Sequence, residues 1–77
     1  MNTTMRLSLM GIVKGFETIT EQPHSRVTFK VNRCLRYETL SDENGIAKFK
    51  FKINFPQPSF AKVTSESPMS NYFLIQE

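Results

Sequence analysis

Apolar and polar residues alternate along much of this chain, most strictly over residues 46–55. There Ala47, Phe49, Phe51, Ile53 and Phe55 alternate with Lys48, Lys50, Lys52 and Asn54. Because successive side chains of a β-strand point to opposite faces, this pattern predicts a half-buried strand with its aromatic rings inside and its lysines outside. Apolar residues do not recur at the helical period, so the chain is expected to be all-β.

Further segments of the chain either alternate or lie between turn signals. They are residues 5–13, 16–20, 26–32, 34–40, 60–64 and 71–76. With residues 46–55 they give about seven short strands, a number typical of a small antiparallel β-sandwich. A five-stranded barrel of the oligonucleotide-binding (OB) type is the alternative. Residues 1–77 are expected to form a single domain.

The composition is that of a small folded domain. Seven Phe and two Tyr lie among 77 residues, and 39% of the residues are hydrophobic. A chain of this size buries only about 60% of the surface that its unfolded form exposes, so its stability margin is thin. The aromatic side chains are therefore expected to supply much of the core.

Basic residues concentrate in the middle of the chain, whose net charge is +3. Residues 26–52 contain seven of the ten Lys and Arg residues but only three of the seven Asp and Glu residues. Such a surface attracts phosphate groups or acidic protein surfaces. The candidate basic contact face consists of Arg26, Lys30, Lys48, Lys50 and Lys52. The plainer interpretation is that these side chains form the solvated outer face of a sheet.

Binding to unpaired bases would also require exposed aromatic rings beside the charges. The Phe residues within 46–55 are expected on the face opposite the lysines, so they are unsuited to this role. Phe29 is expected to point inward from its own alternating strand, so the aromatic residues that remain are Phe16, Tyr37, Phe60, Tyr72 and Phe73. Among them, Phe16 and Tyr37 are the candidate aromatic contacts in a nucleic-acid interpretation.

The chain offers few groups for catalysis or metal binding, with a single His, a single Cys and a single Asp. No residue pairs with His24 at metal-ligand spacing, and glycine-rich phosphate loops and nucleophile motifs are absent from the sequence. A Cys34–His24 pair would need the fold to bring the two together. We therefore expect no catalytic, metal or cofactor site and no enzymatic activity.

Cys34 and the hydropathy bear on the environment of the protein. A lone cysteine cannot form an internal disulfide, which favours an intracellular compartment, and its plainest interpretation is a buried thiol. No apolar run is long enough to span a membrane, so no membrane partner is expected. Residues 5–13 are interpreted as a strand because Lys14 follows where a signal peptide has small residues.

The stretch YETLSDENGIAKFKFKI, residues 37–53, contains a tight turn that leads into the alternating strand. It resembles the strand–turn–strand element of immunoglobulin-like (Ig-like) β-sandwich modules, among them macroglobulin-type domains and Ig-like repeats of microbial surface proteins. The matching residues are Asp42, Glu43, Asn44, Gly45, Ile46, Ala47 and Phe49. The resemblance covers residues 26–64 and implies a scaffold or interaction module without catalytic residues. Arg33 departs from it, because the family tends to have glycine there.

The N-terminal part of the chain carries a second resemblance. The segment MRLSLMGIV is similar to the opening strand of single-strand-binding proteins, and GIVKGFETIT is similar to the first strands of cold-shock domains. This resemblance implies an OB-type fold that binds single-stranded nucleic acid. Glu17 and Thr18 depart from the cold-shock pattern, which alternates aromatic residues and glycines.

Two functions are therefore expected, and the first is preferred to the second. The first is a non-enzymatic β-sandwich module that acts by contact with another protein or as a structural unit. The alternative is a protein that binds single-stranded nucleic acid through the candidate basic face and its flanking aromatic residues. The oligomeric state and the identity of the partner are left open, because fold alone does not determine function.

Overall fold

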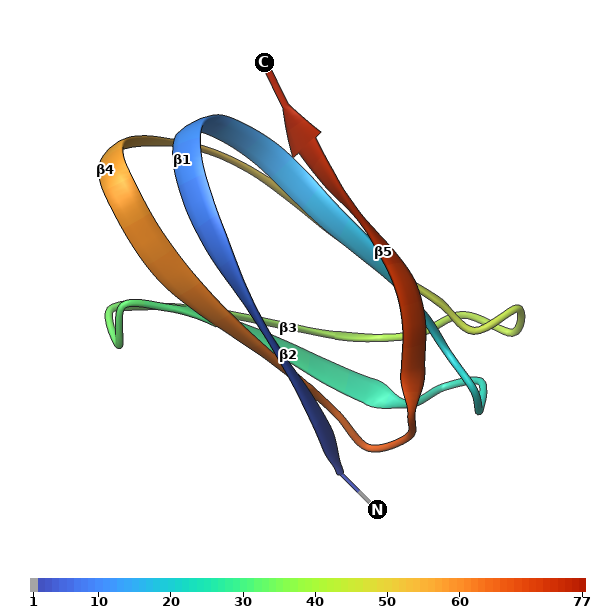
Figure 1. Ribbon diagram of the computed structural model, residues 1–77. Coiled ribbons are helices and arrows are strands. Elements are labelled where there is room, and N and C mark those ends of the chain that lie inside the picture. The colour runs from blue at the N-terminus through green and yellow to red at the C-terminus, as the bar shows by residue number, and fades with distance from the viewer. Residues whose placement is uncertain (1) are drawn as a thin grey trace.

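The chain forms one antiparallel sheet of five strands. The computed structural model describes residues 2–77 and contains β1 (Thr3–Thr20), β2 (Arg26–Val31), β3 (Leu35–Leu40), β4 (Ile46–Ser65) and β5 (Met69–Gln76) (Figure 1). The strand order is β3-β2-β4-β1-β5, and residues 2–77 include no helix. The expectation of an all-β chain is confirmed.

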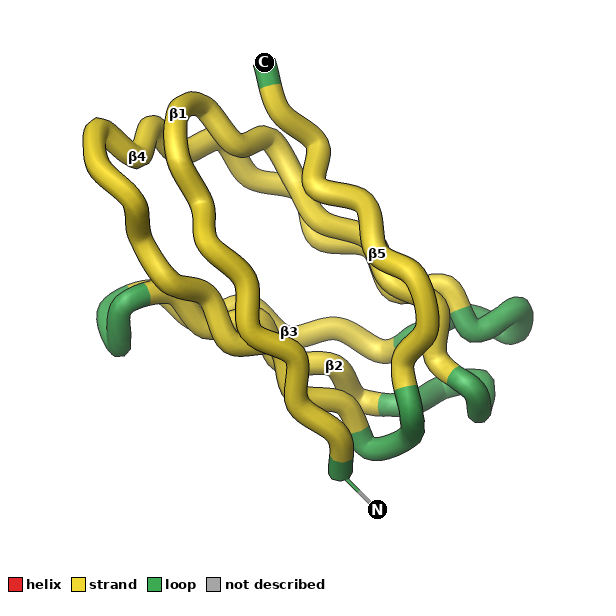
Figure 2. The backbone as a smooth tube through the Cα atoms, in the orientation of Figure 1, coloured by secondary structure: helices red, strands yellow, loops and turns green. Residues whose placement is uncertain are grey.

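Two long strands, β1 and β4, organise the sheet. They pair from Thr3↔Ser65 to Ile19↔Ile46, and both turn back near the same end of the molecule (Figure 2). β2 pairs with β3 on one side and with residues 61–65 of β4 on the other, and β5 pairs with residues 13–20 of β1.

The bend divides the sheet into two halves. We call β3, β2, residues 59–65 of β4 and residues 3–9 of β1 the four-strand half. The three-strand half consists of residues 46–55 of β4, residues 11–20 of β1, and β5. The core lies on the inner, concave side between the two halves.

The predicted number of strands is wrong, because two pairs of predicted strands are each continuous. Residues 5–13 and 16–20 both belong to β1, and residues 46–55 and 60–64 both belong to β4. Pro56 and Pro58 lie where the register between the two long strands shifts, from Gly11↔Phe55 to Leu9↔Ser59. Prolines are tolerated at such bulges, which bend a strand without ending it.

The sheet is also not closed into a barrel, because the outermost strands β3 and β5 each pair on one side only within residues 2–77. The closed five-stranded barrel is therefore not found. Assignment to an Ig-like module or to the OB family stays a prediction.

The core combines apolar residues from both halves. Its buried members are Leu9, Val13, Phe16, Val27, Phe29, Val31, Ala47, Phe49, Phe55, Ala61 and Val63. The ring of Phe16 lies 5.1 Å from that of Phe29 and 6.3 Å from that of Phe49, measured between centroids. The predicted alternation over residues 46–55 is confirmed, since the lysines are exposed while the apolar residues are buried or half-buried.

The prediction that Phe16 is a surface contact is wrong, because its side chain is fully buried. Strict alternation from the buried Val13 would place Phe16 outside. The register shift between Val13 and Gly15 breaks that alternation, so that Phe16 points inward and Glu17 outward.

Tyr37 and Cys34 occupy different environments from those expected. Tyr37 is half-buried, and its ring stacks on that of Phe51 at 5.1 Å, which leaves it poorly placed to stack on a base. The expectation of a buried Cys34 is wrong, since the thiol is exposed. The reason is that Cys34 belongs to the β2–β3 turn and not to a strand.

Hydroxyl groups join the turns at one end of the molecule. The Thr20 hydroxyl donates to Ser41 Oγ at 2.8 Å, and Ser41 Oγ accepts from the Ser25 backbone N–H at 2.9 Å. Ser25 Oγ lies 2.7 Å from Ser67 Oγ, in the β4–β5 turn. Because all four residues are buried, these bonds satisfy groups that would otherwise be costly to remove from water.

The turn between β3 and β4 has the geometry that its sequence predicts. Asp42 Oδ1 accepts hydrogen bonds from the backbone N–H groups of Asn44 at 2.8 Å and Ile46 at 2.9 Å. Gly45 has a φ of 83°, in the left-handed region that glycine adopts without steric cost. The hydrogen bond from Ile46, with further contributions from Asn44 and the charge of Lys48, lowers the pKa of Asp42 from 3.8.

Candidate functional site

The structure does not bring the predicted basic contact face together. Lys48, Lys50 and Lys52 lie on the outside of the three-strand half, whereas Arg26 and Lys30 lie on β2 in the four-strand half. All five side chains are exposed. They do not form one face, because β2 pairs with residues 61–65 of β4 and not with residues 46–55.

The three lysines of residues 46–55 follow a single strand. Across the ladder to β1, Lys48 lies opposite Glu17 and Lys50 lies opposite Gly15. The neighbouring strand therefore adds the carboxylate of Glu17, and its own lysine, Lys14, is paired with Glu77. This arrangement agrees with the plainer interpretation, a solvated face with its charges spaced along one strand.

A different basic row crosses the outside of the four-strand half. Lys30 of β2 lies opposite Arg36 of β3 on one side and opposite Lys62 of β4 on the other, and Lys62 lies opposite Arg6 of β1. All four side chains are exposed. Directly opposed residues on neighbouring strands have Cβ atoms about 4.5–5.5 Å apart, and like charges at this spacing are destabilising. We call Arg6, Lys30, Lys62 and Arg36 the cross-strand basic row.

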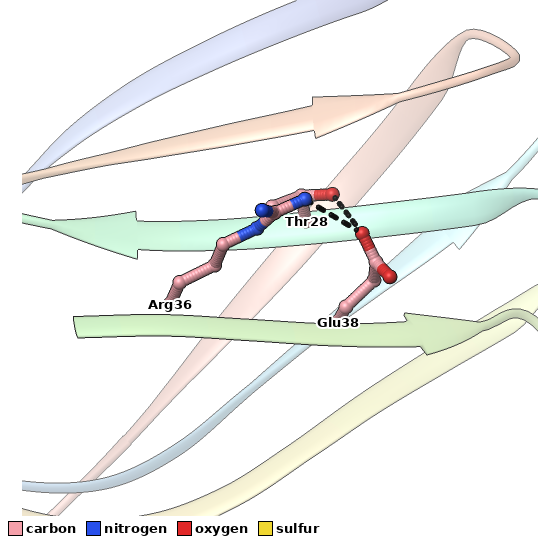
Figure 3. Close-up of polar contacts among 3 residues, drawn as sticks. All are labelled: Thr28, Arg36 and Glu38. Carbon is pink, nitrogen blue, oxygen red and sulfur yellow. Dashed lines mark hydrogen bonds and ion pairs between the residues drawn. The ribbon is translucent and has the colours of Figure 1, made fainter.

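Within the described part of the chain, an ion pair neutralises only the Arg36 end of this row. Arg36 Nη2 lies 3.0 Å from Glu38 Oε2, which also accepts a 3.3 Å hydrogen bond from the Thr28 hydroxyl (Figure 3). Within residues 2–77 the other ion pair joins Lys14 to Glu77, so neither pair involves Arg6, Lys30 or Lys62. These three charges are available to an external anion.

An exposed aromatic ring lies beside the three available charges. Phe60 precedes Lys62 by two residues on β4, so both side chains are on the same face, and Phe60 is 71% exposed. The backbone N–H of Asn32 donates to the Phe60 carbonyl at 3.3 Å. Together these residues border an open hollow of about 440 Å³. Its lining consists of Arg6, Lys30, Asn32, Arg33, Phe60, Ala61 and Lys62, and we call it the basic groove.

The β2–β3 turn supplies Arg33 to this groove in a strained conformation. Asn32 and Arg33 have φ values of 50° and 71°, and the Cys34 N–H donates to the Val31 carbonyl at 3.0 Å. Turns with two successive positive φ angles strongly favour Asn-Gly. A side chain at the second position costs roughly 1–2 kcal/mol, and such strain often marks functional sites. Arg33 therefore adds a fourth positive charge to the groove, at a turn position where glycine would make the fold more stable.

Only some of the groove residues can be identified from the sequence. Lys30 was included in the candidate basic face, and Phe60 was among the aromatic residues outside the alternating strand. Arg6 and Lys62 each stand alone in the sequence, and only the register of β1 with β4 reveals that they are neighbours. The Ig-like modules that the sequence resembles tend to have glycine at this position, and Arg33 in its place is the one local sign of the strained turn.

The groups that could support catalysis lie apart. His24 and Cys34 flank opposite ends of β2, roughly 20 Å or more from each other at the rise of an extended strand. Residues 2–77 include no cluster of three or more His, Cys, Asp or Glu side chains that could hold a metal ion. The described part of the chain forms no helix suited to crossing a membrane.

Comparison with known proteins adds no relative: no family model, curated protein or solved structure matches the chain.

Proposed function

We propose that the protein binds single-stranded nucleic acid in the basic groove. The observation that carries this proposal is the exposed ring of Phe60 beside three basic side chains, Arg6, Lys30 and Lys62, none of which has a carboxylate partner within residues 2–77. Proteins that bind single strands combine a positively charged groove with aromatic rings on which bases stack.

Each part of the groove has a defined role in this proposal. The ammonium groups of Lys30 and Lys62 and the guanidinium of Arg6 contact phosphate oxygens along the strand. The ring of Phe60 stacks on one base, which requires that base to be unstacked from its neighbours and therefore favours a single strand over a duplex. Arg33, which also lines the groove, contacts a further phosphate. The binding role requires no catalysis.

The number of phosphate contacts sets an expected salt dependence. For single strands, the slope of log K against log salt concentration is about −0.7 for each neutralised phosphate, so four contacts give a slope of about −3. An acidic protein surface would share the sensitivity to salt but would not require an exposed ring for base stacking.

Fluorescence anisotropy with a short labelled oligothymidine, which reaches a single groove, tests the proposal. We expect Phe60→Ala to weaken binding by about 1–3 kcal/mol, the usual contribution of one stacked base, which is about 5- to 150-fold in Kd. Phe73→Ala is a matched control, because Phe73 is also exposed but lies on the three-strand half. A duplex of the same length should bind more weakly. Failure to bind in low salt, or equal effects of the two Phe substitutions, would contradict the proposal.

Contact with another protein is the second candidate function, and one observation favours it. Strand β5 has a free edge that carries no charged residue, whereas the other free edges of the sheet are charged. The Ig-like interpretation also belongs here, since modules of that kind act through such edges.

A further inference from the structure

Strand β5 is an edge strand that lacks two of the usual protections against pairing with another chain, a charged residue and a proline. It pairs with β1 on one side, from Val13↔Gln76 to Thr20↔Met69, and no strand of residues 2–77 covers its other side. Its sequence, MSNYFLIQ, contains no charged residue and no proline. Natural edge strands usually carry such residues, because an unprotected edge pairs with other chains.

The regular part of this edge is short and apolar. Asn71 has a φ of 51° and interrupts the register between Ser70 and Tyr72, so the regular edge covers residues 72–76. Phe73 and Ile75 point to the outer face and are 63% and 40% exposed.

The remaining free edges of the sheet carry charge. Residues 3–9 of β1 include Arg6, β3 includes Arg36 and Glu38, and residues 46–55 include three lysines. Among these edges, that of β5 can accept a second strand with the least electrostatic repulsion between two chains of net charge +3.

We propose that two copies of the chain pair through residues 72–76 of β5, antiparallel, about a two-fold axis at Leu74. In this register Phe73 lies opposite Ile75 of the second copy, and Ile75 lies opposite Phe73 of the second copy. Pairs of aromatic and β-branched side chains are favourable across antiparallel strands. The sequence of β5 is self-complementary in this register, as a two-fold interface requires, and no like charges oppose one another.

The dimer would join the three-strand halves of both copies into one continuous sheet. The basic grooves lie on the four-strand halves, away from β5, so both would stay open. Two grooves on one particle would bind a long single strand more tightly than a short one, by raising the effective concentration of the second site. The pairing itself does not depend on the proposed function of the groove.

Sedimentation velocity of the full chain tests the pairing across about 1 to 500 μM, because dimer formation depends on protein concentration. The wild type should shift from monomer to dimer within this range. Phe73→Lys should raise the dissociation constant of the dimer at least about tenfold. Leu40→Lys is a matched control, since Leu40 is similarly exposed but lies on β3, at the opposite edge of the sheet, and it should dimerise like the wild type.

A double substitution sharpens the test. In the proposed register, Phe73→Lys combined with Ile75→Glu places each lysine opposite a glutamate of the second copy, so dimerisation should return toward the wild-type level. Circular dichroism of each variant verifies that it is folded, and Ile75→Lys replaces Phe73→Lys if the latter unfolds. A wild type that stays monomeric throughout, or a dimer that persists in Phe73→Lys, would overturn the proposal.

The proposed binding site and the proposed dimer can be contradicted independently, because each has its own variant and its own measurement. Phe60→Ala should weaken binding of a short oligonucleotide and leave sedimentation unchanged. Phe73→Lys should alter sedimentation and leave binding of that oligonucleotide within about twofold, a difference of about 0.4 kcal/mol.

Discussion

The outer faces of the two halves both carry rows of basic side chains, but the rows run in different directions. In the three-strand half, Lys48, Lys50 and Lys52 follow one strand, and the adjacent strand places Glu17 opposite Lys48. In the four-strand half, the basic residues lie opposite one another on successive strands.

The difference in direction indicates which row only follows from the fold and which is a candidate binding site. Lysines that alternate with buried residues along a strand are the solvated complement of the core and need no further explanation. Like charges opposed across a ladder instead lower stability, and an exposed aromatic ring beside them adds nothing to the core. The cross-strand basic row is therefore the better candidate for binding.

The largest expected effect tests whether the two halves share one core. Phe29 is fully buried and packs against Phe16 of the other half, so Phe29→Ala should lower the free energy of unfolding by about 3–5 kcal/mol. Phe51→Ala should cost less, because Phe51 is only half-buried. Urea denaturation measures both. Equal losses for the two variants would show that the core is not centred between the halves.

A smaller effect of opposite sign is expected at the strained turn beside the groove. Arg33→Gly should raise the free energy of unfolding by about 1 kcal/mol, because glycine adopts a φ of 71° without steric cost. The same substitution should weaken oligonucleotide binding through loss of one charge. A variant that is less stable than the wild type would contradict the assigned strain.

A third, still smaller effect on stability is expected when one lysine is replaced in each of the two rows. Lys62→Gln should stabilise the fold by about 0.2–1 kcal/mol at low ionic strength, because it relieves repulsion from Lys30 and Arg6. Lys50→Gln is the control and should have no such effect, since Lys50 lies opposite Gly15. In about 1 M salt the gain at Lys62 should disappear, because the Debye length falls to about 3 Å. Equal effects of the two substitutions would remove the distinction between the rows.

The smallest effect concerns the turn that leads into the single-strand lysine row. The Ile46 N–H lowers the pKa of the Asp42 carboxyl below 3.8, so ionised Asp42 stabilises the fold above that pH. This contribution is lost as the pH falls through the lowered pKa of the folded state. We expect the stability difference between the wild type and Asp42→Asn to shrink between about pH 6 and pH 2 in urea titrations. A difference that is constant over this range would show that the charge of Asp42 contributes nothing.

The sequence alone predicted the features that depend on local pattern. The alternation over residues 46–55 and the Asp-Glu-Asn-Gly turn are confirmed, because each follows from the geometry of a few consecutive residues. Phe16 is misplaced by strict alternation because a register shift next to Gly15 reverses the faces of β1, and the only local sign of that shift is the glycine itself, which often marks a bulge within a strand. The same cause made two long bent strands resemble four short ones.

The candidate site could not be predicted in the same way. The four members of the cross-strand basic row come from four different strands, so the row exists only once the order β3-β2-β4-β1 and its registers are fixed. Local charge density favours residues 26–52, which contain seven of the ten Lys and Arg residues, over the isolated Arg6 and Lys62.

The salt dependence of oligothymidine binding tests the assignment of the site to the cross-strand basic row most directly. Anisotropy titrations between about 50 and 200 mM salt should give the wild type and Lys50→Gln the same slope, about −3 in log K against log salt concentration. Lys62→Gln should give a slope smaller in magnitude by about 0.7, the share of one phosphate contact. The same slope in all three proteins, or a loss confined to Lys50→Gln, would contradict the assignment.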